Sequence, residues 1–371
     1  MKHCVPMKCT SSAARRSFEL LLRRWEQPTT GEGRVVLLSG EPGIGKSRLI
    51  AALAQSVGDT PHAVVQLACS PHYQDAPLYP FIRQIERAAN IKRDDAPAAK
   101  LAKLRCSLPA EHQTPDVAIL ADLLSIDSAA EDLAGTLTPH QRKEMTFAAI
   151  LRQFKSWART VPILSVLEDV HWADPTSLEL LNLLVETAER LPMLLVITTR
   201  PMPQPLWASR PQVTVQFLNA FNRRDAASLI QEVIGGRTIP EEVIDRIIAH
   251  ADGVPLYIEE LTTTVLERGL PRQGDGHLPP FEPLSADAVP TSLQASLMAR
   301  LDALPIGKEV AQIGSVIGRD FSFEMLQALV SIPAAQWSGR SRTWSKPESC
   351  LCVSRRRKLL IPFLHQSELA I

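Results

Sequence analysis

Short apolar runs alternate with amphipathic stretches in the first half of the chain. Residues 18–25 and 47–56 carry apolar side chains at helical spacing. The apolar runs predict buried strands at residues 35–38, 63–68, 161–167 and 193–197. Because helices separate successive strands, the pattern predicts an α/β fold in which a parallel sheet carries helices on both faces.

A long segment without strands interrupts this alternation. Residues 72–160 contain several amphipathic stretches and no comparable apolar run. We therefore expect a large helical insert within an α/β domain that spans residues 18–205. The polar residues 1–17 show no periodicity and predict an irregular lead.

The second half of the chain is predicted to be helical and then irregular. Residues 206–270 hold helical patterns that end at glycines, which is typical of an all-helical lid. Residues 271–290 are rich in proline and predict a linker, and residues 291–336 predict a short helical segment. Residues 337–371 predict an irregular tail, in which we expect the cations at 355–358 to be solvated rather than bound to nucleic acid.

The most specific motif follows the first predicted strand. Residues 40–47 read GEPGIGKS and match the phosphate-loop pattern G-x-x-x-x-G-K-[ST] without a gap. Glycines let successive N–H groups point into one concavity, and the helix that follows adds the positive end of its dipole. Lys46 is suited to reach the outer phosphates, and the Ser47 hydroxyl to bind Mg²⁺. The residues expected to bind ATP are Gly40, Glu41, Pro42, Gly43, Ile44, Gly45, Lys46 and Ser47.

Two acids, Glu168 and Asp169, end the third predicted strand. Beside a phosphate loop, one such acid holds the Mg²⁺ and the other orients or deprotonates the attacking water. By position, Glu168 matches the acid on the metal side and Asp169 the acid on the water side. Since strand residues alternate sides, the two roles are also open to exchange.

Polar residues at other strand ends have structural as well as functional interpretations. Residues 198–200 offer hydroxyls and the cation of Arg200 to sense a terminal phosphate, or form a turn before Pro201. Asp174 is expected to be the N-cap of a helix, while His171 is open between a structural and a nucleotide-sensing role. All these residues fall at the carboxyl ends of predicted strands, where parallel sheets bind ligands, so we expect one site.

Composition narrows the alternatives. The 40 Lys+Arg residues and 40 Asp+Glu residues cancel, so no net field favours nucleic acid or an anionic membrane. The sequence has neither an apolar run long enough for a membrane span nor the apolar core of a signal peptide. Its six cysteines lack zinc-finger spacing. We therefore expect a reduced, cytoplasmic protein.

Four motifs together resemble a known family. In chain order, GEPGIGKS, LEDVHWADP, ITTRP and DGVPLYIEELT resemble the STAND group of AAA-type signalling ATPases. They are most similar to the ATPase module of bacterial multidomain proteins with an N-terminal class III adenylate or guanylate cyclase domain. The resemblance covers residues 18–330. It implies a P-loop NTPase fold, ATP and Mg²⁺ as cofactors, slow hydrolysis, and a partner or effector domain that receives the signal.

The resemblance also implies roles for single residues. Arg200 corresponds to the sensor-like arginine after the fourth strand. Glu168, Asp169 and Arg200 would then form the catalytic group, with Ser47 and Glu168 on the metal. Gly253 and Pro255 would form the lid motif near the base.

Three features differ from the family pattern. The Gly-Arg-Glu box before the first helix reads Ala13-Ala14-Arg15, too few residues precede it for a cyclase domain, and the expected winged helix is truncated. We therefore expect a fragment of a longer protein, without cyclase chemistry of its own. The competing hypotheses are the ATPase part of a transcription regulator, which would bind DNA in a salt-dependent manner, and a non-functional fragment.

Overall fold

The structure is a computed structural model that describes residues 12–29, 31–58, 61–108, 114–126, 137–236 and 239–269, with short strands at 320–322, 352–353 and 358–360. The chain divides into two compact units, Met1–Phe221 and Asn222–Ile371, and each is described by itself. The predicted linker at 271–290, and residues 291–319 and 323–336 of the predicted helical segment, lie outside the described residues. The described residues of that segment, Asp320–Ser322, form the strand β6, and those of the predicted irregular tail form the strands β7 (Cys352–Val353) and β8 (Lys358–Leu360).

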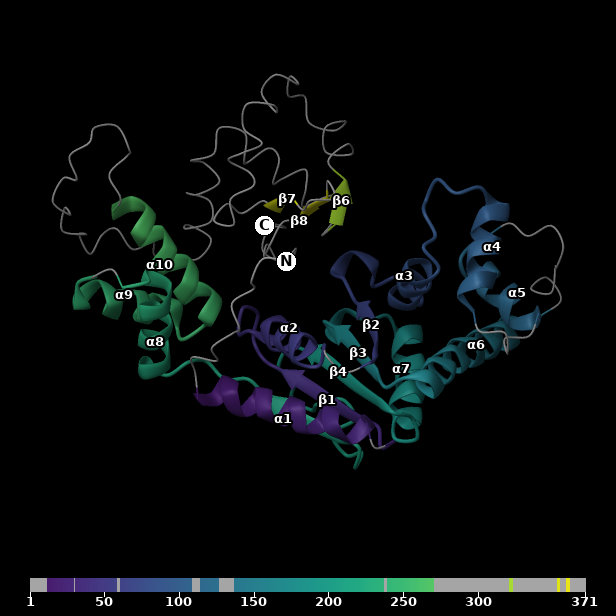
Figure 1. Ribbon diagram of the computed structural model, residues 1–371, viewed down its shortest axis with the longest axis horizontal. Coiled ribbons are helices and arrows are strands. Elements are labelled where there is room, and N and C mark those ends of the chain that lie inside the picture. The colour runs from purple at the N-terminus through teal and green to yellow at the C-terminus, as the bar shows by residue number, and fades with distance from the viewer. Residues whose placement is uncertain are drawn as a thin grey trace, which may run out of the picture. The chain divides into compact units, whose positions relative to one another are not determined.

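A five-stranded parallel sheet forms the centre of the first unit (Figure 1). Its order is β2-β3-β4-β1-β5, and every neighbouring pair is parallel. The strands are β1 (Arg34–Ser39), β2 (Ala63–Ala68), β3 (Ile163–Glu168), β4 (Met193–Thr199) and β5 (Val213–Phe217). The predicted α/β fold is confirmed, and the four predicted strands are present. The prediction that residues 63–68 are a buried strand is wrong in part, because β2 alternates between buried and exposed residues.

Helices cover both faces of this sheet and create two cores. The helices that share these cores with the strands include α1 (Ser12–Thr29), α2 (Lys46–Ser56) and α7 (Pro175–Ala188). Val36 and Leu38 belong to the core that contains residues of α1 and α2. Val35 and Leu37 belong to the other core, which contains α7 and the insert. Because strand side chains alternate, burial on both faces requires the continuous apolar runs that mark β1, β3 and β4 in the sequence.

The segment between β2 and β3 is helical where it is described, as the pattern predicts. It contains the short 3₁₀ helix η1 (Pro71–Tyr73), α3 (Tyr79–Ala88), α4 (Pro97–Ser107), α5 (Thr114–Leu123) and α6 (Pro139–Thr160). An ion pair between the buried Asp116 and Arg152 joins α5 to α6, with 2.9 Å from Arg152 Nε to Asp116 Oδ2. The insert is therefore held both by its apolar face and by a paired charge.

The helix α1 begins earlier than predicted. It starts at Ser12, so residues 12–17 belong to a helix and not to the predicted irregular lead. Alanine and arginine are good helix formers, and they dominate this stretch. Ser17 is buried, and its hydroxyl donates to the Ala13 carbonyl oxygen at 3.1 Å. The sequence carries no apolar periodicity here because most of the other side chains in this turn are exposed.

The sheet also extends beyond residue 205, where the helical lid was predicted to begin. The strand β5 pairs with β1 in parallel at the edge of the sheet. Thr214 and Gln216 interrupt its apolar residues, so it lacks the run that identifies a buried strand. The predicted boundary at 205 is therefore too early, and the first unit ends at Phe221.

Three helices make up the described core of the second unit. They are α8 (Arg223–Ile234), α9 (Glu241–Ala251) and α10 (Pro255–Gly269). Asn222 caps α8 by accepting from the Asp225 N–H at 2.9 Å, and Gly235 ends the helix in the left-handed region at φ 61°. The buried apolar residues of these helices include Leu229, Ile230, Val243, Ile247, Ile258 and Leu261. The sequence predicts these helices and their ends closely.

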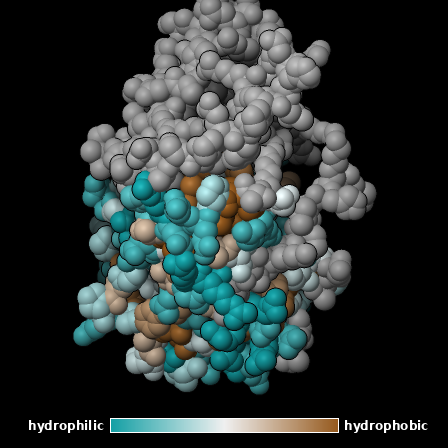
Figure 2. Space-filling view, turned by 90° about the vertical axis from the view of Figure 1, so that its left-hand side faces the viewer, coloured by the Kyte–Doolittle hydropathy of each residue, from teal (hydrophilic) through white to brown (hydrophobic). Residues whose placement is uncertain are grey.

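The described surface is largely polar. The side drawn in Figure 2 is mostly hydrophilic where its residues are coloured, with smaller hydrophobic areas. Large exposed hydrophobic side chains among the described residues are Val64, Tyr73, Leu183 and Phe217. None of the helices that the structure describes has the length and the apolar character needed to cross a bilayer. The apolar side chains are thus concentrated in the interior.

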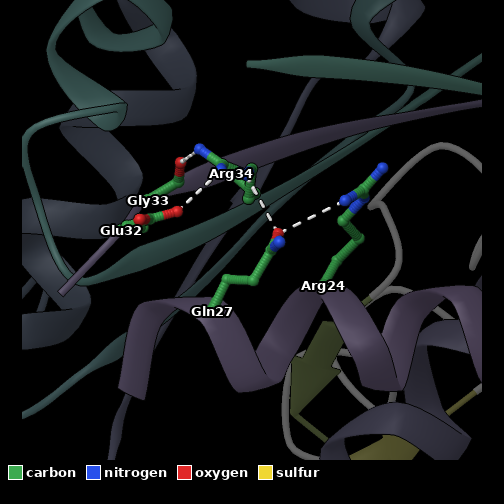
Figure 3. Close-up of polar contacts among 5 residues, drawn as sticks. All are labelled: Arg24, Gln27, Glu32, Gly33 and Arg34. Atoms are coloured by element: carbon green, nitrogen blue, oxygen red, sulfur yellow. Dashed lines mark hydrogen bonds and ion pairs between the residues drawn. The ribbon is translucent and has the colours of Figure 1, made fainter. Parts of the chain in front are cut away.

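A polar network attaches α1 to the start of β1 (Figure 3). The Gln27 side-chain oxygen accepts from Arg34 Nε at 2.9 Å and from Arg24 Nη1 at 3.3 Å. Arg34 also donates to the Gly33 carbonyl oxygen at 3.1 Å and pairs with Glu32 at 2.7 Å. The network determines how the chain enters the strand that carries the phosphate loop.

Gly33 lies in this network and approaches the end of α7. A Cβ at Gly33 would lie 1.8 Å from the Ala188 carbonyl oxygen, a distance that only a backbone shift relieves. We expect Gly33→Ala to lower the free energy of unfolding by at least about 2 kcal/mol, as overpacking does. Urea unfolding measures this. Gly58→Ala is the control, since its Cβ would meet nothing closer than 3.2 Å, and equal stability of the two variants would contradict the prediction.

Candidate nucleotide-binding site

The phosphate loop connects β1 to α2 through two glycines with positive φ. Gly43 has φ 75° and Gly45, which directly precedes α2, has φ 102°. Glycine takes these angles without strain, so the chain turns sharply here. Gly40 is needed for a different reason, because a Cβ there would lie 2.9 Å from Ile44 Cγ2 and 3.1 Å from the Leu218 carbonyl oxygen. The spacing of the motif thus matches the space that the backbone leaves.

Lys46 is the first residue of α2 and is buried. Its Nζ donates to the carbonyl oxygens of Gly40 at 2.6 Å and Glu41 at 3.0 Å. Burial lowers the pKa of Lys46, with a smaller lowering by the cation of Arg200, while the carboxylate of Asp169 opposes both. A phosphate chain in the loop would favour the charged form further. The ammonium is therefore held by the loop itself, in the field of Asp169 and Arg200.

Oxygen donors suited to Mg²⁺ accompany the loop. Ser47 is exposed at the start of α2, and Glu168 is partly exposed at the end of β3. Within the described ranges, no group of three or more His, Cys, Asp or Glu side chains is placed to hold a metal ion. In nucleotide sites Mg²⁺ takes one or two protein oxygens and completes its shell with phosphate and water, so Ser47 and Glu168 offer the kind of oxygen donor that it binds.

The acidic strand end is a sharp turn. Asp169 follows β3 in the left-handed region, with φ 57° and ψ 48°, and is nearly buried. Its N–H donates to Thr198 Oγ1 at 2.9 Å, and its carbonyl oxygen accepts from the Trp172 N–H at 2.9 Å. Because the chain leaves the strand conformation here, strand alternation does not decide on which side the Asp169 carboxylate lies. The carboxylate of Asp169 raises the pKa of Lys46, which burial lowers.

The end of β4 joins the acidic turn to the phosphate loop. Thr198 and Thr199 are buried residues of the strand and not a turn after it, because β4 is longer than predicted. The Gly40 N–H donates to the Thr199 carbonyl oxygen at 3.2 Å. Arg200 follows directly, and its guanidinium carbon lies 5.4 Å from the centroid of the Trp172 ring. The hydroxyl of Thr198 is thus used in the structure to hold Asp169.

Two further residues belong to this edge of the sheet. Asp174 is the N-cap of α7, as predicted, and accepts from the Ser177 N–H at 2.8 Å. Sequence reasoning missed Cys69, whose N–H donates to the Glu168 carbonyl oxygen at 3.0 Å. Burial and then the charges of Asp169 and Asp174 raise the pKa of the Cys69 thiol to about 12, so it stays protonated near neutral pH. Its position directly after β2 was the available signal, because β2 ends at the same edge.

Gly253 and Pro255 lie in the second unit. Gly253 has φ 71°, and Pro255 is the first residue of α10. Both positions suit the turn that starts a helix. Their expected role near the base stays a prediction.

Comparison with known proteins finds family models that are similar to parts of both units. Residues 15–197 match the family model of the AAA ATPase domain. Residues 222–276 match a domain of unknown function, DUF8739. The phosphate loop, the strands β1 to β3 and most of β4 thus lie within the part of the chain that is similar to AAA ATPase domains.

An uncharacterised protein of Rhizobium meliloti (strain 1021) is similar to most of the chain. It is 26% identical over 313 residues, which are 82% of this chain and 29% of the relative. The chain thus spans less than a third of the length of the curated relative that it matches.

Several solved structures are similar at low sequence identity. A STAND protein with a tetratricopeptide repeat sensor from Pyrococcus horikoshii has a TM-score of 0.46 and 16% identity, covering 94% of this chain and 41% of that one. Drosophila ORC bound to DNA has a TM-score of 0.41 and 11% identity, covering 100% and 94%. A RuvB mutant of Thermotoga maritima has a TM-score of 0.37 and 14% identity, covering 94% and 93%.

The hydrogen bond from the Asp169 N–H to Thr198 Oγ1 can be tested by comparing substitutions of Thr198 and of its neighbour Thr199. We expect Thr198→Val to lower the free energy of unfolding by about 1–3 kcal/mol, because it leaves the buried Asp169 N–H without its acceptor. Thr199→Val is the matched control, since the Thr199 hydroxyl donates only to Met202 Sδ at 3.4 Å. Urea unfolding of both variants measures the difference. An equal decrease in the free energy of unfolding for both variants would contradict the stabilising role of the Thr198 hydroxyl.

Proposed function

We propose that this chain is an ATP-binding, Mg²⁺-dependent signalling ATPase module that acts as a nucleotide-dependent switch. The observation that carries the proposal is that hydrogen bonds join the phosphate loop, the turn at Asp169 and the end of β4 before Arg200 at one edge of the sheet, with the Lys46 ammonium held in the loop. A buried cation on a phosphate loop, an acid and a second cation form the set that terminal-phosphate chemistry requires.

Each part of the site has a role in this proposal. Residues 40–47 bind the phosphates, with Lys46 as their main cation. Ser47 and Glu168 hold Mg²⁺, which neutralises phosphate charge when bound. Asp169 orients the attacking water and accepts its proton. Arg200 contacts the terminal phosphate and stabilises the charge that develops on it.

A switch needs groups that distinguish ATP from ADP. In this proposal Asp169 and Arg200 distinguish them, because Arg200 contacts the terminal phosphate and Asp169 orients the water that attacks it. Two hydrogen bonds support the coupling: Asp169 N–H to Thr198 Oγ1, and Gly40 N–H to the Thr199 carbonyl oxygen. A change at the terminal phosphate would thus act on β4 from the acidic turn and from the phosphate loop together.

We further propose that the module regulates an effector domain in a longer, adenylate cyclase-like protein of the cytoplasm. The four motifs quoted above support this, together with the greater length of the R. meliloti relative. In this proposal the helices from α8 to α10 are the lid, and Gly253 and Pro255 contact the base. Expression of the complete gene product, followed by a cyclase assay on the wild type and on variants of the ATP site, would test the regulatory role.

The assignment of Lys46 predicts a clear ligand effect. At a hundred times its dissociation constant, Mg-ATP should stabilise the full chain by about 2.7 kcal/mol in thermal unfolding. Lys46→Ala should abolish this shift, because the phosphates lose their main cation. Arg48→Ala is the matched control, since it removes an exposed cation from the same helix. A shift that survives Lys46→Ala would contradict the assignment.

The two acids are separated by their different effects. We expect Asp169→Asn to lower the ATP hydrolysis rate about a hundredfold or more with little change in affinity, because it removes the proton acceptor. Glu168→Gln should instead raise the Mg²⁺ concentration that binding requires. Hydrolysis rates and a Mg²⁺ titration of ATP binding measure the two effects. If Asp169→Asn alters the Mg²⁺ requirement and Glu168→Gln does not, the roles are exchanged.

A further inference from the structure

Arg200 lies against an aromatic ring. Its guanidinium carbon is 5.4 Å from the centroid of the Trp172 indole, within the range of about 6 Å at which a cation over an aromatic face is attracted. Both residues are partly buried, which strengthens the attraction relative to a fully exposed pair. The two residues come from different segments, Arg200 after β4 and Trp172 from the turn after β3.

The Trp172 ring is itself held in place. Its backbone N–H donates to the Asp169 carbonyl oxygen at 2.9 Å, which closes the 3₁₀ turn η3 (Val170–Trp172). The indole packs against the core that contains α7. The His171 ring lies beside it at 4.9 Å between centroids. Trp172 is therefore held beside Asp169 by a backbone hydrogen bond and by packing contacts.

The contact with Trp172 holds Arg200 near a second cation, Lys46. Lys46 and Arg200 are both cationic, and the charge of Arg200 lowers the pKa of Lys46. Without a bound anion the two charges repel each other. An indole face attracts a guanidinium without neutralising its charge. The N–H groups of the guanidinium can therefore still donate to other acceptors.

We propose that Trp172 is a positioning residue: its indole holds the Arg200 guanidinium at the carboxyl edge of the sheet, and thereby sets the preference of the site for ATP over ADP. This inference rests on the proposed function. Preorganisation of a donor at the place where phosphate charge lies lowers the ordering cost that binding would otherwise require. In this proposal Arg200 contacts only the terminal phosphate, which ADP lacks, so the affinity for ADP does not depend on Trp172.

The test uses the full chain with fluorescent ATP and ADP analogues and a hydrolysis assay. Trp172→Leu, which keeps apolar packing, should lower the ratio of ATP to ADP affinity and kcat by about three- to tenfold. Trp172→Phe should restore most of the loss, since it keeps an aromatic face. Trp157→Leu is the matched control, because Trp157 is a partly buried tryptophan of the insert helix α6. It should leave the ratio unchanged.

A double-mutant cycle decides whether Trp172 acts through Arg200. In an Arg200→Ala background, Trp172→Leu should cause no further loss in the ratio or in kcat. An equal effect of Trp172→Leu on ATP and ADP, or a full effect without Arg200, overturns the inference and leaves the proposed function standing. A wild-type chain that binds no ATP overturns both.

Discussion

The parallel pairing of β1, β3 and β4 is the constraint on which the site depends. Parallel strands end at the same edge, so the phosphate loop after β1, the acids after β3 and Arg200 after β4 meet there although they are far apart in sequence. The hydrogen bonds of the sheet continue into the site, from Gly40 N–H to the Thr199 carbonyl oxygen and from Asp169 N–H to Thr198. The strand ends are thereby joined side by side.

Three charged side chains, Lys46, Asp169 and Arg200, lie at this edge of the sheet and are buried or partly buried. Lys46 is desolvated, and its ammonium is held by two backbone carbonyl oxygens of its own loop. Burial of a cation is costly unless hydrogen bonds and an opposite charge compensate for it. Asp169 supplies that charge, and the acid is itself held by backbone bonds on both sides. In the proposed function, the phosphates of ATP would relieve the repulsion between Lys46 and Arg200.

Close packing at the opposite end of the sheet supports the same geometry. Gly33 allows β1 to begin against the end of α7, and the network around Gln27 and Arg34 attaches α1 to that point. The cores on both faces then leave β1 little freedom, since its residues from Val35 to Leu38 are fully buried. Structural contacts at the start of β1, which take no part in ligand binding, thus help to position the phosphate loop at the other end of the strand.

The sequence alone determined the parts whose signals are local. Continuous apolar runs identified β1, β3 and β4, because strands buried on both faces need them. The run at residues 63–68 identified β2, although alternate residues of that strand are exposed. The spacing of residues 40–47 identified the phosphate loop, and Asp174 before Pro175 identified an N-cap, since each motif works within a few residues. The edge strand β5 and the start of α1 were missed, because their half-exposed residues leave no apolar run.

Only the tertiary structure decided which strand ends meet and how their side chains are held. No local pattern shows that Thr198 binds the Asp169 N–H, that Arg200 lies over Trp172, or that Cys69 lies near the acids. Asp169 also leaves the strand in a left-handed turn, which period-two alternation does not anticipate. These contacts join segments separated by many residues, so they depend on the order of the strands. Sheet order comes from the packing of the whole core, which no short stretch of sequence encodes.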